Sequence, residues 1–121
     1  MTGEQLLDGL FQAITSRDLG PVEDLYDPEV QVWAGPSGRS LDRAGSLRLL
    51  QAFLERTESV RYEVLERRHW EGGAMQRHVL HMRISEHDHQ LDVCIVFAFS
   101  GGRISRIWEY LDGRALAPLG W

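Results

Sequence analysis

Hydrophobic residues recur every three or four positions through most of the first half of the chain, which is the spacing of an amphipathic helix. Leu6, Leu10 and Ile14 show the pattern in the first such segment. Capping residues and prolines mark where each segment begins and ends. The predicted helices are residues 4–16, a short segment that begins at the N-cap Asp18 and ends at Asp27-Pro28, and a segment that begins after Ser40 or Asp42 and ends near Arg56.

In the second half, hydrophobic residues alternate with polar ones, as they do along a strand with one buried face. Neighbouring glycines predict tight turns, most clearly at Gly101-Gly102. The predicted strands are a short one at residues 30–33, followed by a loop at 35–38, and four longer ones at residues 60–69, 74–85, 91–99 and 103–111, with a hairpin tip at 86–89.

Helices followed by a run of antiparallel strands predict an α+β fold with the helices on one sheet face. We expect three N-terminal helices packed on a curved, mostly antiparallel sheet, forming a single domain over residues 1–121. Such a sheet curls into a cone around the first helix and leaves an apolar internal pocket. That pocket is the expected ligand site.

Charge and residue usage exclude several functions. The net charge is −5 with histidine neutral, which argues against a nucleic-acid partner. All 13 basic residues are arginines, so a Schiff-base lysine and a phosphate-loop lysine are both excluded. No apolar run reaches the roughly 20 residues of a membrane helix, no signal peptide is visible, and the single cysteine, Cys94, excludes an internal disulfide. We therefore expect a cytoplasmic protein with no membrane partner.

Glu109 is the strongest candidate for acid–base chemistry. It shares a strand face with Ile107 and Leu111, so a carboxyl group stands in an apolar row. Burial would raise its pKa toward neutrality, as a general acid or base requires. The alternative is a glutamate at the rim of the fold, paired with a nearby arginine.

His81 is the second candidate, because histidine titrates near neutral pH. It shares a strand face with Val79 and Arg83, and the alternative for it is a core histidine hydrogen-bonded to a neighbour. Arg83 could orient an oxyanion or pair with Glu109, although such an arginine is more often exposed. His78 faces the side opposite to His81, so the two cannot share a metal ion, and we expect no metal site.

Three stretches carry a family resemblance. They are Ala13–Asp18 continuing to Leu25-Tyr26, the segment Asp27–Val30 that leads into the first strand, and Val96–Ile104 followed by Trp108–Asp112. Together they resemble the nuclear transport factor 2-like superfamily, in its SnoaL-like and limonene epoxide hydrolase-like branch. The resemblance covers nearly the whole chain and implies the cystatin-like cone. It specifies the fold better than the reaction, because this fold hosts many activities.

The resemblance also implies positions for the chemistry. Ketosteroid isomerases carry an aspartate base at the end of the first strand, where this chain has Trp33-Ala34, so that base is not supported. Limonene epoxide hydrolases carry an acid on the last strand, which corresponds to Glu109. Their Arg-x-Asp pair, counted from Gly73, corresponds to Val79 and His81.

We therefore expect a cofactor-independent enzyme that carries out acid–base chemistry on a small apolar molecule, by cyclisation, isomerisation, dehydration or epoxide opening. The alternative is a non-catalytic module of the same fold that binds a small molecule or a protein. Glu109 and His81 are the predicted catalytic residues. The predicted substrate-binding residues are Phe11, Ile14, Trp33, Tyr62, Arg83, Val93 and Leu111. Because both sheet faces carry apolar residues, we also expect a homodimer.

Overall fold

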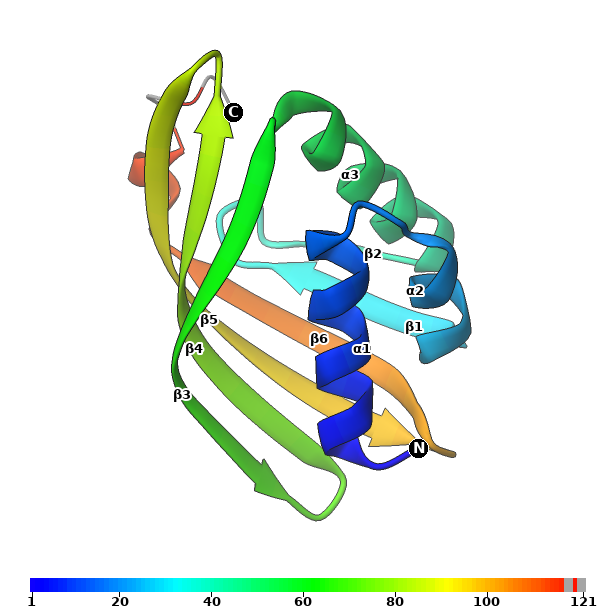
Figure 1. Cartoon of the computed structure of the whole chain (residues 1–121). Coiled ribbons are helices and arrows are strands. Elements are labelled where there is room, and N and C mark those ends of the chain that lie inside the picture. The colour runs from blue at the N-terminus through cyan, green and yellow to red at the C-terminus, as the bar shows by residue number, and fades with distance from the viewer. Residues whose placement is uncertain (117–118, 120–121) are drawn as a thin grey trace.

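The chain folds into three α-helices packed against a six-stranded sheet (Figure 1). The computed structural model describes residues 1–116 and 119. The helices are α1 (Gly3–Thr15), α2 (Gly20–Leu25) and α3 (Arg43–Arg56), with a short 3₁₀ helix η1 (Gly113–Ala115). The strands are β1 (Tyr26–Ala34), β2 (Arg39–Leu41), β3 (Ser59–Trp70), β4 (Gly73–Ile84), β5 (His87–Ser100) and β6 (Arg103–Leu111). The prediction of an α+β fold with three N-terminal helices is confirmed.

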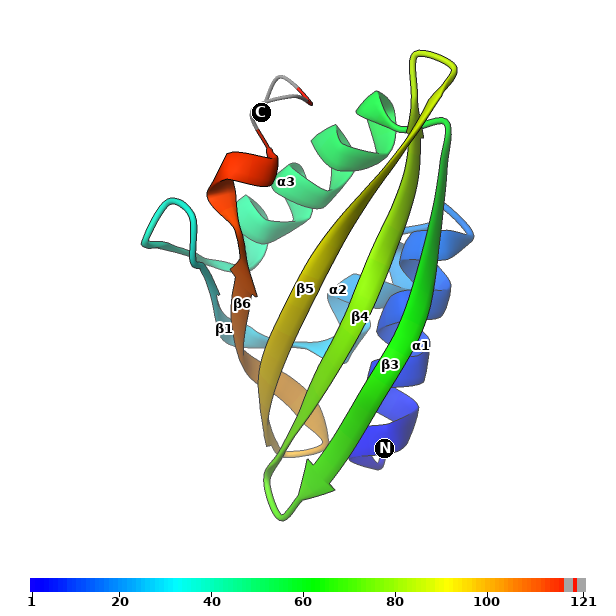
Figure 2. The same ribbon diagram turned by 90° about the vertical axis from the view of Figure 1, so that its left-hand side faces the viewer.

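The sheet is mixed and open. Its strand order is β2-β1-β6-β5-β4-β3, and β1 runs parallel to β6 while the other neighbouring pairs are antiparallel. Figure 1 shows the sheet curving around α1, with α3 lying over β1. Figure 2 shows β3, β4 and β5 in front of the helices. We call the sheet face that packs on the helices the inner face, and the opposite one the outer face.

Capping residues fix the two long helices. Thr2 forms a capping box with Gln5 at the start of α1, through hydrogen bonds of 2.9 and 3.2 Å. Asp42, rather than Ser40, caps α3 by accepting a hydrogen bond from the Gly45 amide at 2.8 Å. For α2 the prediction was wrong by one residue. Its N-cap is Leu19, and Asp18 accepts from the Gly20 amide without being the cap.

Three boundaries differ from the sequence prediction. The first strand already begins at Tyr26, and Asp27-Pro28 lies within it at an irregularity in its pairing with β6 rather than ending a helix. A turn is present at residues 35–38 as predicted, but it leads into the short β2, a strand that the sequence analysis did not predict and that pairs with β1 as a hairpin. The β4–β5 turn consists of Ser85 and Glu86, both with positive φ, so β5 begins earlier than the predicted tip implied.

Strand alternation decides which side chains face the helices. On β5, Leu91, Val93, Ile95 and Phe97 are buried on the inner face, where they meet Leu6, Leu10 and Phe11 of α1 in one core. On β4 the inner residues include Gln76, His78 and Met82, because they pair in register with Ile95, Val93 and His89. The inner face therefore carries polar residues inside an otherwise apolar core. In the described residues, no helix has both the length and the apolar character that a bilayer crossing demands.

Candidate active site on the inner face of the sheet

Four ionisable side chains face the helices from four different strands. They are Tyr26 of β1, Tyr62 of β3, His78 of β4 and Glu109 of β6, and we call them the inner cluster. Each is placed by strand register opposite a buried apolar residue or in contact with the core. Polar groups in an apolar interior destabilise the fold unless each one has a hydrogen-bonding partner, so the partners of each group are described in turn.

Glu109 lies on the inner face, as the sequence predicted. In the sheet it is the register partner of Ile95 on one side and Ala34 on the other. Its backbone is held by a hydrogen bond from the Gly35 amide to the Glu109 carbonyl oxygen at 2.8 Å. Its carboxyl group forms no hydrogen bond or ion pair with any residue that the structure describes. Burial raises the pKa of this carboxyl above its ordinary value.

Two tyrosines of the inner cluster, Tyr26 and Tyr62, lie within electrostatic range of this carboxyl. Burial, and then the charge of Glu109 close by, raise the pKa of Tyr62 far above its ordinary value. The pKa of Tyr26 is also raised, chiefly by burial, although its hydroxyl hydrogen-bonds to the Ser46 hydroxyl at 3.3 Å. Both phenols therefore remain protonated at neutral pH. A protonated phenol is a hydrogen-bond donor for a carboxylate or for an oxygen of a ligand.

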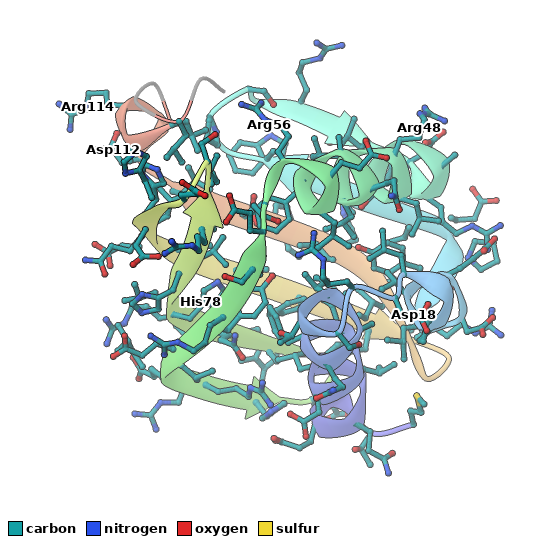
Figure 3. All side chains as sticks on the ribbon, turned by 45° about the horizontal axis from the view of Figure 1, so that its top comes forward. Asp18, Arg48, Arg56, His78, Asp112 and Arg114 are labelled. Carbon is teal, nitrogen blue, oxygen red and sulfur yellow. The ribbon has the colours of Figure 1, made fainter. Side chains whose placement is uncertain are left out.

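His78 completes the inner cluster and is almost completely buried, with 1% of its surface exposed. Its ring stands at 90° to the Tyr62 ring, with centroids 5.0 Å apart, and packs edge-on against Phe11 at 5.6 Å. Desolvation lowers the pKa of His78 to about 4, so the imidazole is neutral at pH 7. Gln76 hydrogen-bonds to its Nδ1 at 3.0 Å. Figure 3 shows His78 on β4, well away from Asp112 and Arg114, which meet beyond the end of β6.

The apolar residues next to the inner cluster are incompletely covered. Leu80 and Leu111, like Tyr62 of the cluster itself, point to the inner face but keep part of their surface exposed. Leu50 and Phe53 of α3 are likewise half-buried against the same core. Side chains that face the helices and yet remain accessible indicate that α1 and α3 leave part of the inner face uncovered. This is the apolar surface against which a ligand could lie.

Most of the predicted substrate-binding residues meet on this face. Phe11, Ile14 and Val93 are buried in the core, and Tyr62 and Leu111 pack against it. The Phe11 and Tyr62 rings are in direct contact, with centroids 4.8 Å apart. These five residues come from four elements, so the strand periodicity and the helical periodicity were combined correctly for them.

For three predicted site residues the prediction was wrong, because they lie on the outer face. His81 and Arg83 occupy the outer face of β4, since residues 79, 81 and 83 alternate with the inner residues 78, 80 and 82. His81 pairs with Glu63 at 2.8 Å. Arg83 pairs with Glu58 at 3.4 Å and Asp88 at 3.1 Å.

Trp33 also lies on the outer face. Its register partner on β6 is Trp108, and its ring packs against the Tyr110 ring with centroids 5.2 Å apart. The structure therefore does not bring His81 and Glu109 together, and Trp33 does not face Phe11.

Two residues of the inner cluster were missed by the sequence analysis. Tyr26 was assigned to a helix, although it opens β1. His78 was considered only as a metal ligand together with His81, although its parity with Leu80 and Met82 already placed it on the apolar face of β4. Among the residues described, no group of three histidine, cysteine or acidic side chains is arranged to hold a metal ion.

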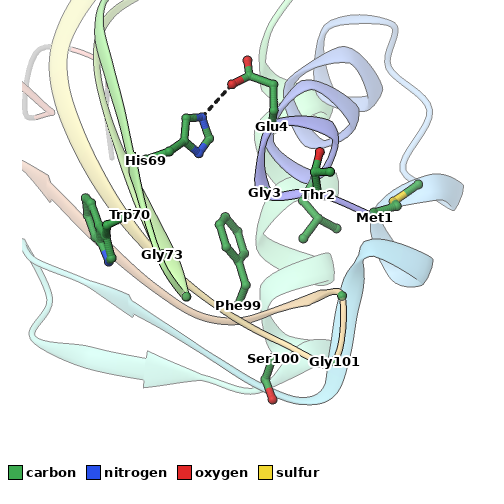
Figure 4. A pocket seen from close by; sticks show the side chains of 13 residues that line it. Met1, Thr2, Gly3, Glu4, His69, Trp70, Gly73, Phe99, Ser100 and Gly101 are labelled. Atoms are coloured by element: carbon green, nitrogen blue, oxygen red, sulfur yellow. Dashed lines mark ion pairs between the residues drawn. The ribbon is translucent and has the colours of Figure 1, made fainter.

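Two open grooves lie on the surface of the described residues. One, of about 440 Å³, lies at the end of the molecule near the chain's N-terminus, between the start of α1 and the turns of the β3–β4 and β5–β6 hairpins (Figure 4). Its Glu4 and His69 side chains form an ion pair at 2.8 Å. The other, of about 350 Å³, is lined by the outer-face residues Arg77, Cys94 and Tyr110 and also by His78, Val93 and Leu111, whose side chains point to the inner face. The inner cluster is the better candidate, because its polar groups are buried or half-buried against the core and the Glu109 carboxyl is unpaired among the described residues.

Comparison with known proteins identifies the family. The sequence profile of the SnoaL-like domain matches residues 7–107. The chain belongs to the SnoaL-like family. Among curated proteins, none matches this SnoaL-like chain in sequence.

Solved structures share the fold at low sequence identity. IdmH of Streptomyces antibioticus, a proposed polyketide cyclase, is 19% identical, with a TM-score of 0.86 and 100% of both chains covered. AclR of Streptomyces galilaeus, a proposed hydroxylase, is 15% identical, with a TM-score of 0.84, covering 97% of this chain and 94% of AclR. TerC, co-crystallised with polyporic acid, is 14% identical, with a TM-score of 0.82, covering 96% of this chain and 95% of TerC. At such identities the likeness establishes the fold of this SnoaL-like chain.

Proposed function

We propose that this chain is an enzyme that carries out acid–base chemistry on a small, largely apolar molecule without a cofactor, with Glu109 as the proton-transferring group. The observation that carries the proposal is the Glu109 carboxyl, which faces the core without a partner among the described residues and has a raised pKa. An unpaired buried acid destabilises a fold. Such groups concentrate at functional sites, where their altered pKa is useful.

The neighbouring groups fit a proton-transfer role. A carboxyl whose pKa is raised toward neutrality can accept a proton from a carbon or oxygen acid and return it. The phenol of Tyr62 and the neutral imidazole of His78 are donors that could stabilise negative charge on the substrate. His78 thus takes the partner role that the sequence assigned to His81. The half-buried apolar surface around them would exclude water from the reacting atoms.

The related structures support a small-molecule substrate. IdmH is a proposed polyketide cyclase, AclR a proposed hydroxylase, and TerC was crystallised with polyporic acid. The proposal covers cyclisation, isomerisation, dehydration and epoxide opening alike, since each needs a positioned acid or base in a dry site. The second candidate function is non-catalytic binding of the same kind of molecule, in which the inner cluster only hydrogen-bonds the ligand.

Mass spectrometry of the purified protein under native and denaturing conditions would test the proposal directly. We expect a small molecule to be released on unfolding, or substrates of the relevant size to be bound and converted when a library of aromatic and cyclic carbonyl compounds is incubated with the protein. Binding with no conversion by either the protein or its Glu109→Gln variant would favour the non-catalytic module.

A further inference from the structure

A chain of hydrogen bonds links the surface of α1 to the buried His78. At the surface, Arg67 of β3 donates through its Nη1 atom to Glu4 at 3.0 Å and to Asp8 at 2.6 Å. The Arg67 Nε atom donates to the Gln76 side-chain oxygen at 2.8 Å. The Gln76 side-chain nitrogen then lies 3.0 Å from the His78 Nδ1 atom. Gln76 and His78 are both almost completely buried, at 0% and 1% exposure.

In this series of hydrogen bonds, the donor and the acceptor of each bond can be assigned in only one way. A guanidinium group only donates, so the atom of Gln76 that faces Arg67 must be its carbonyl oxygen. The amide nitrogen of Gln76 is thereby turned toward His78 and donates to Nδ1. A neutral imidazole that accepts at Nδ1 carries its proton on Nε2. Arg67 thus determines the tautomer of His78 through two hydrogen bonds and the orientation of one amide, that of Gln76.

The series of hydrogen bonds ends at the Nε2 atom of His78. Within residues 1–116 and 119, His78 has no hydrogen bond besides that with Gln76. The two ring nitrogens point in different directions, so Nε2 points away from Gln76. A buried N–H group without an acceptor destabilises the folded protein. An acceptor on a bound molecule would remove this destabilisation.

We propose that Arg67 and Gln76 are positioning residues that hold His78 as the Nε2–H tautomer, so that its buried ring offers a fixed hydrogen-bond donor to an acceptor oxygen of the bound molecule. The ligand part of this proposal rests on the proposed function, whereas the tautomer part does not. The ligand class is an apolar molecule with at least one carbonyl or hydroxyl oxygen. Arg67 and Gln76 themselves do not need to touch that molecule.

Nuclear magnetic resonance of protein labelled with ¹⁵N-histidine tests the network without a substrate. Long-range proton–nitrogen correlations distinguish a protonated ring nitrogen from a bare one, and a His78→Gln variant assigns the His78 signals among the five histidines. We expect His78 to carry its proton on Nε2 in the unaltered protein. In Gln76→Glu the new carboxylate accepts from both Arg67 and His78, so the proton should move to Nδ1. A bare Nδ1 with the proton still on Nε2 in folded Gln76→Glu would overturn the proposal.

A second pair of variants covers the case in which Gln76→Glu does not fold. Arg67→Met keeps the apolar stem and removes the donor that orients Gln76, so a second His78 tautomer should appear. The matched control is Arg68→Met on the neighbouring residue, whose guanidinium is exposed and pairs with Glu66 at 2.8 Å. It should leave the His78 signals unchanged. Equal effects of the two variants, or no effect of Arg67→Met, would also overturn the network. Activity that survives Glu109→Gln would instead refute the proposed function and leave the network standing.

Discussion

The Tyr62 hydroxyl lies within the electrostatic reach of Glu109, although the two residues stand on β3 and β6 with two other strands between them. Flat neighbouring strands lie about 4.8 Å apart, so three steps across a flat sheet would separate the two backbones by roughly 14 Å. The curvature of the sheet turns its inner side chains toward one another. The fold therefore brings an unpaired acid and a phenol donor within electrostatic range of each other on the inner face, from two strands that are not neighbours.

The first prediction concerns turnover. Replacing Glu109 by glutamine keeps the shape of the side chain and removes its ability to take a proton, so turnover of a true substrate should fall by roughly 10²–10⁴. Ligand affinity, measured by calorimetry, should change much less. The matched control is Glu63→Gln on the outer face, which should retain full activity. Full activity of Glu109→Gln would exclude the carboxyl as the proton-transferring group.

The second prediction separates the two histidines of β4. His78 faces the inner cluster, whereas His81 faces outward and pairs with Glu63. We expect His78→Asn to lower turnover by about tenfold or more, because it removes a donor near the reacting atoms. His81→Asn should change turnover by less than about twofold, since exposed pairs contribute little. If the two variants behave in the opposite way, the reacting atoms lie on the outer face.

The third prediction is that Glu109 lowers the stability of the folded protein at high pH. Its pKa is raised in the folded protein, so the folded carboxyl holds a proton at pH values where the unfolded one has lost it. The contribution of this group to stability is therefore greatest at low pH and is lost as the pH rises through the folded pKa. Glu109→Gln should be more stable than the unaltered protein at pH 8, by on the order of 1 kcal/mol. Denaturant unfolding at several pH values should show this gain shrinking toward pH 4.

The fourth prediction concerns acid unfolding. His78 titrates at about 4 when folded and at 6.5 in the unfolded chain. Between these values the unfolded chain binds the extra proton, so the stability associated with this group is full above pH 6.5 and is lost as the pH falls toward 4. The loss should approach 1.4 kcal/mol per pH unit at most. The stability of His78→Gln should fall less steeply over that range. Parallel pH profiles of the two proteins would show that His78 is not held neutral.

The sequence predicted the fold and part of the site for identifiable reasons. The alternation along residues 91–99 and the helical spacing of residues 4–16 are strong periodic signals, and both elements formed. The same alternation placed Glu109 on the inner face. The assignment of His81 was wrong because it followed a count from the limonene epoxide hydrolase pattern, whereas the apolar row at Leu80 and Met82 already marked the inner face of β4.

Other parts of the site could not be predicted from the sequence. Tyr26 follows Leu25 in what reads as a helical segment, and it becomes the start of β1 only because β1 pairs in parallel with the distant β6. The Arg67–Gln76–His78 chain spans two strands whose register is shifted near residues 64–66. A simple alternation count along β3 does not carry through such a shift. Contacts that depend on long-range register require the structure.

The last prediction concerns assembly through the outer face, where Figure 2 shows no α-helix in front of β3, β4 and β5. Tyr110 is 48% exposed and its ring packs against Trp33, while Val96 lies in the centre of this face on β5. A second copy of the chain would cover these side chains, so we expect a homodimer in sedimentation velocity at micromolar concentration. Val96→Glu places a charge in the middle of that face and should give monomer without unfolding the chain, as judged by circular dichroism. Leu49→Glu is the matched control, because Leu49 is 54% exposed on α3 and away from this face. It should leave the dimer intact, and a monomer for the unaltered protein would exclude this assembly.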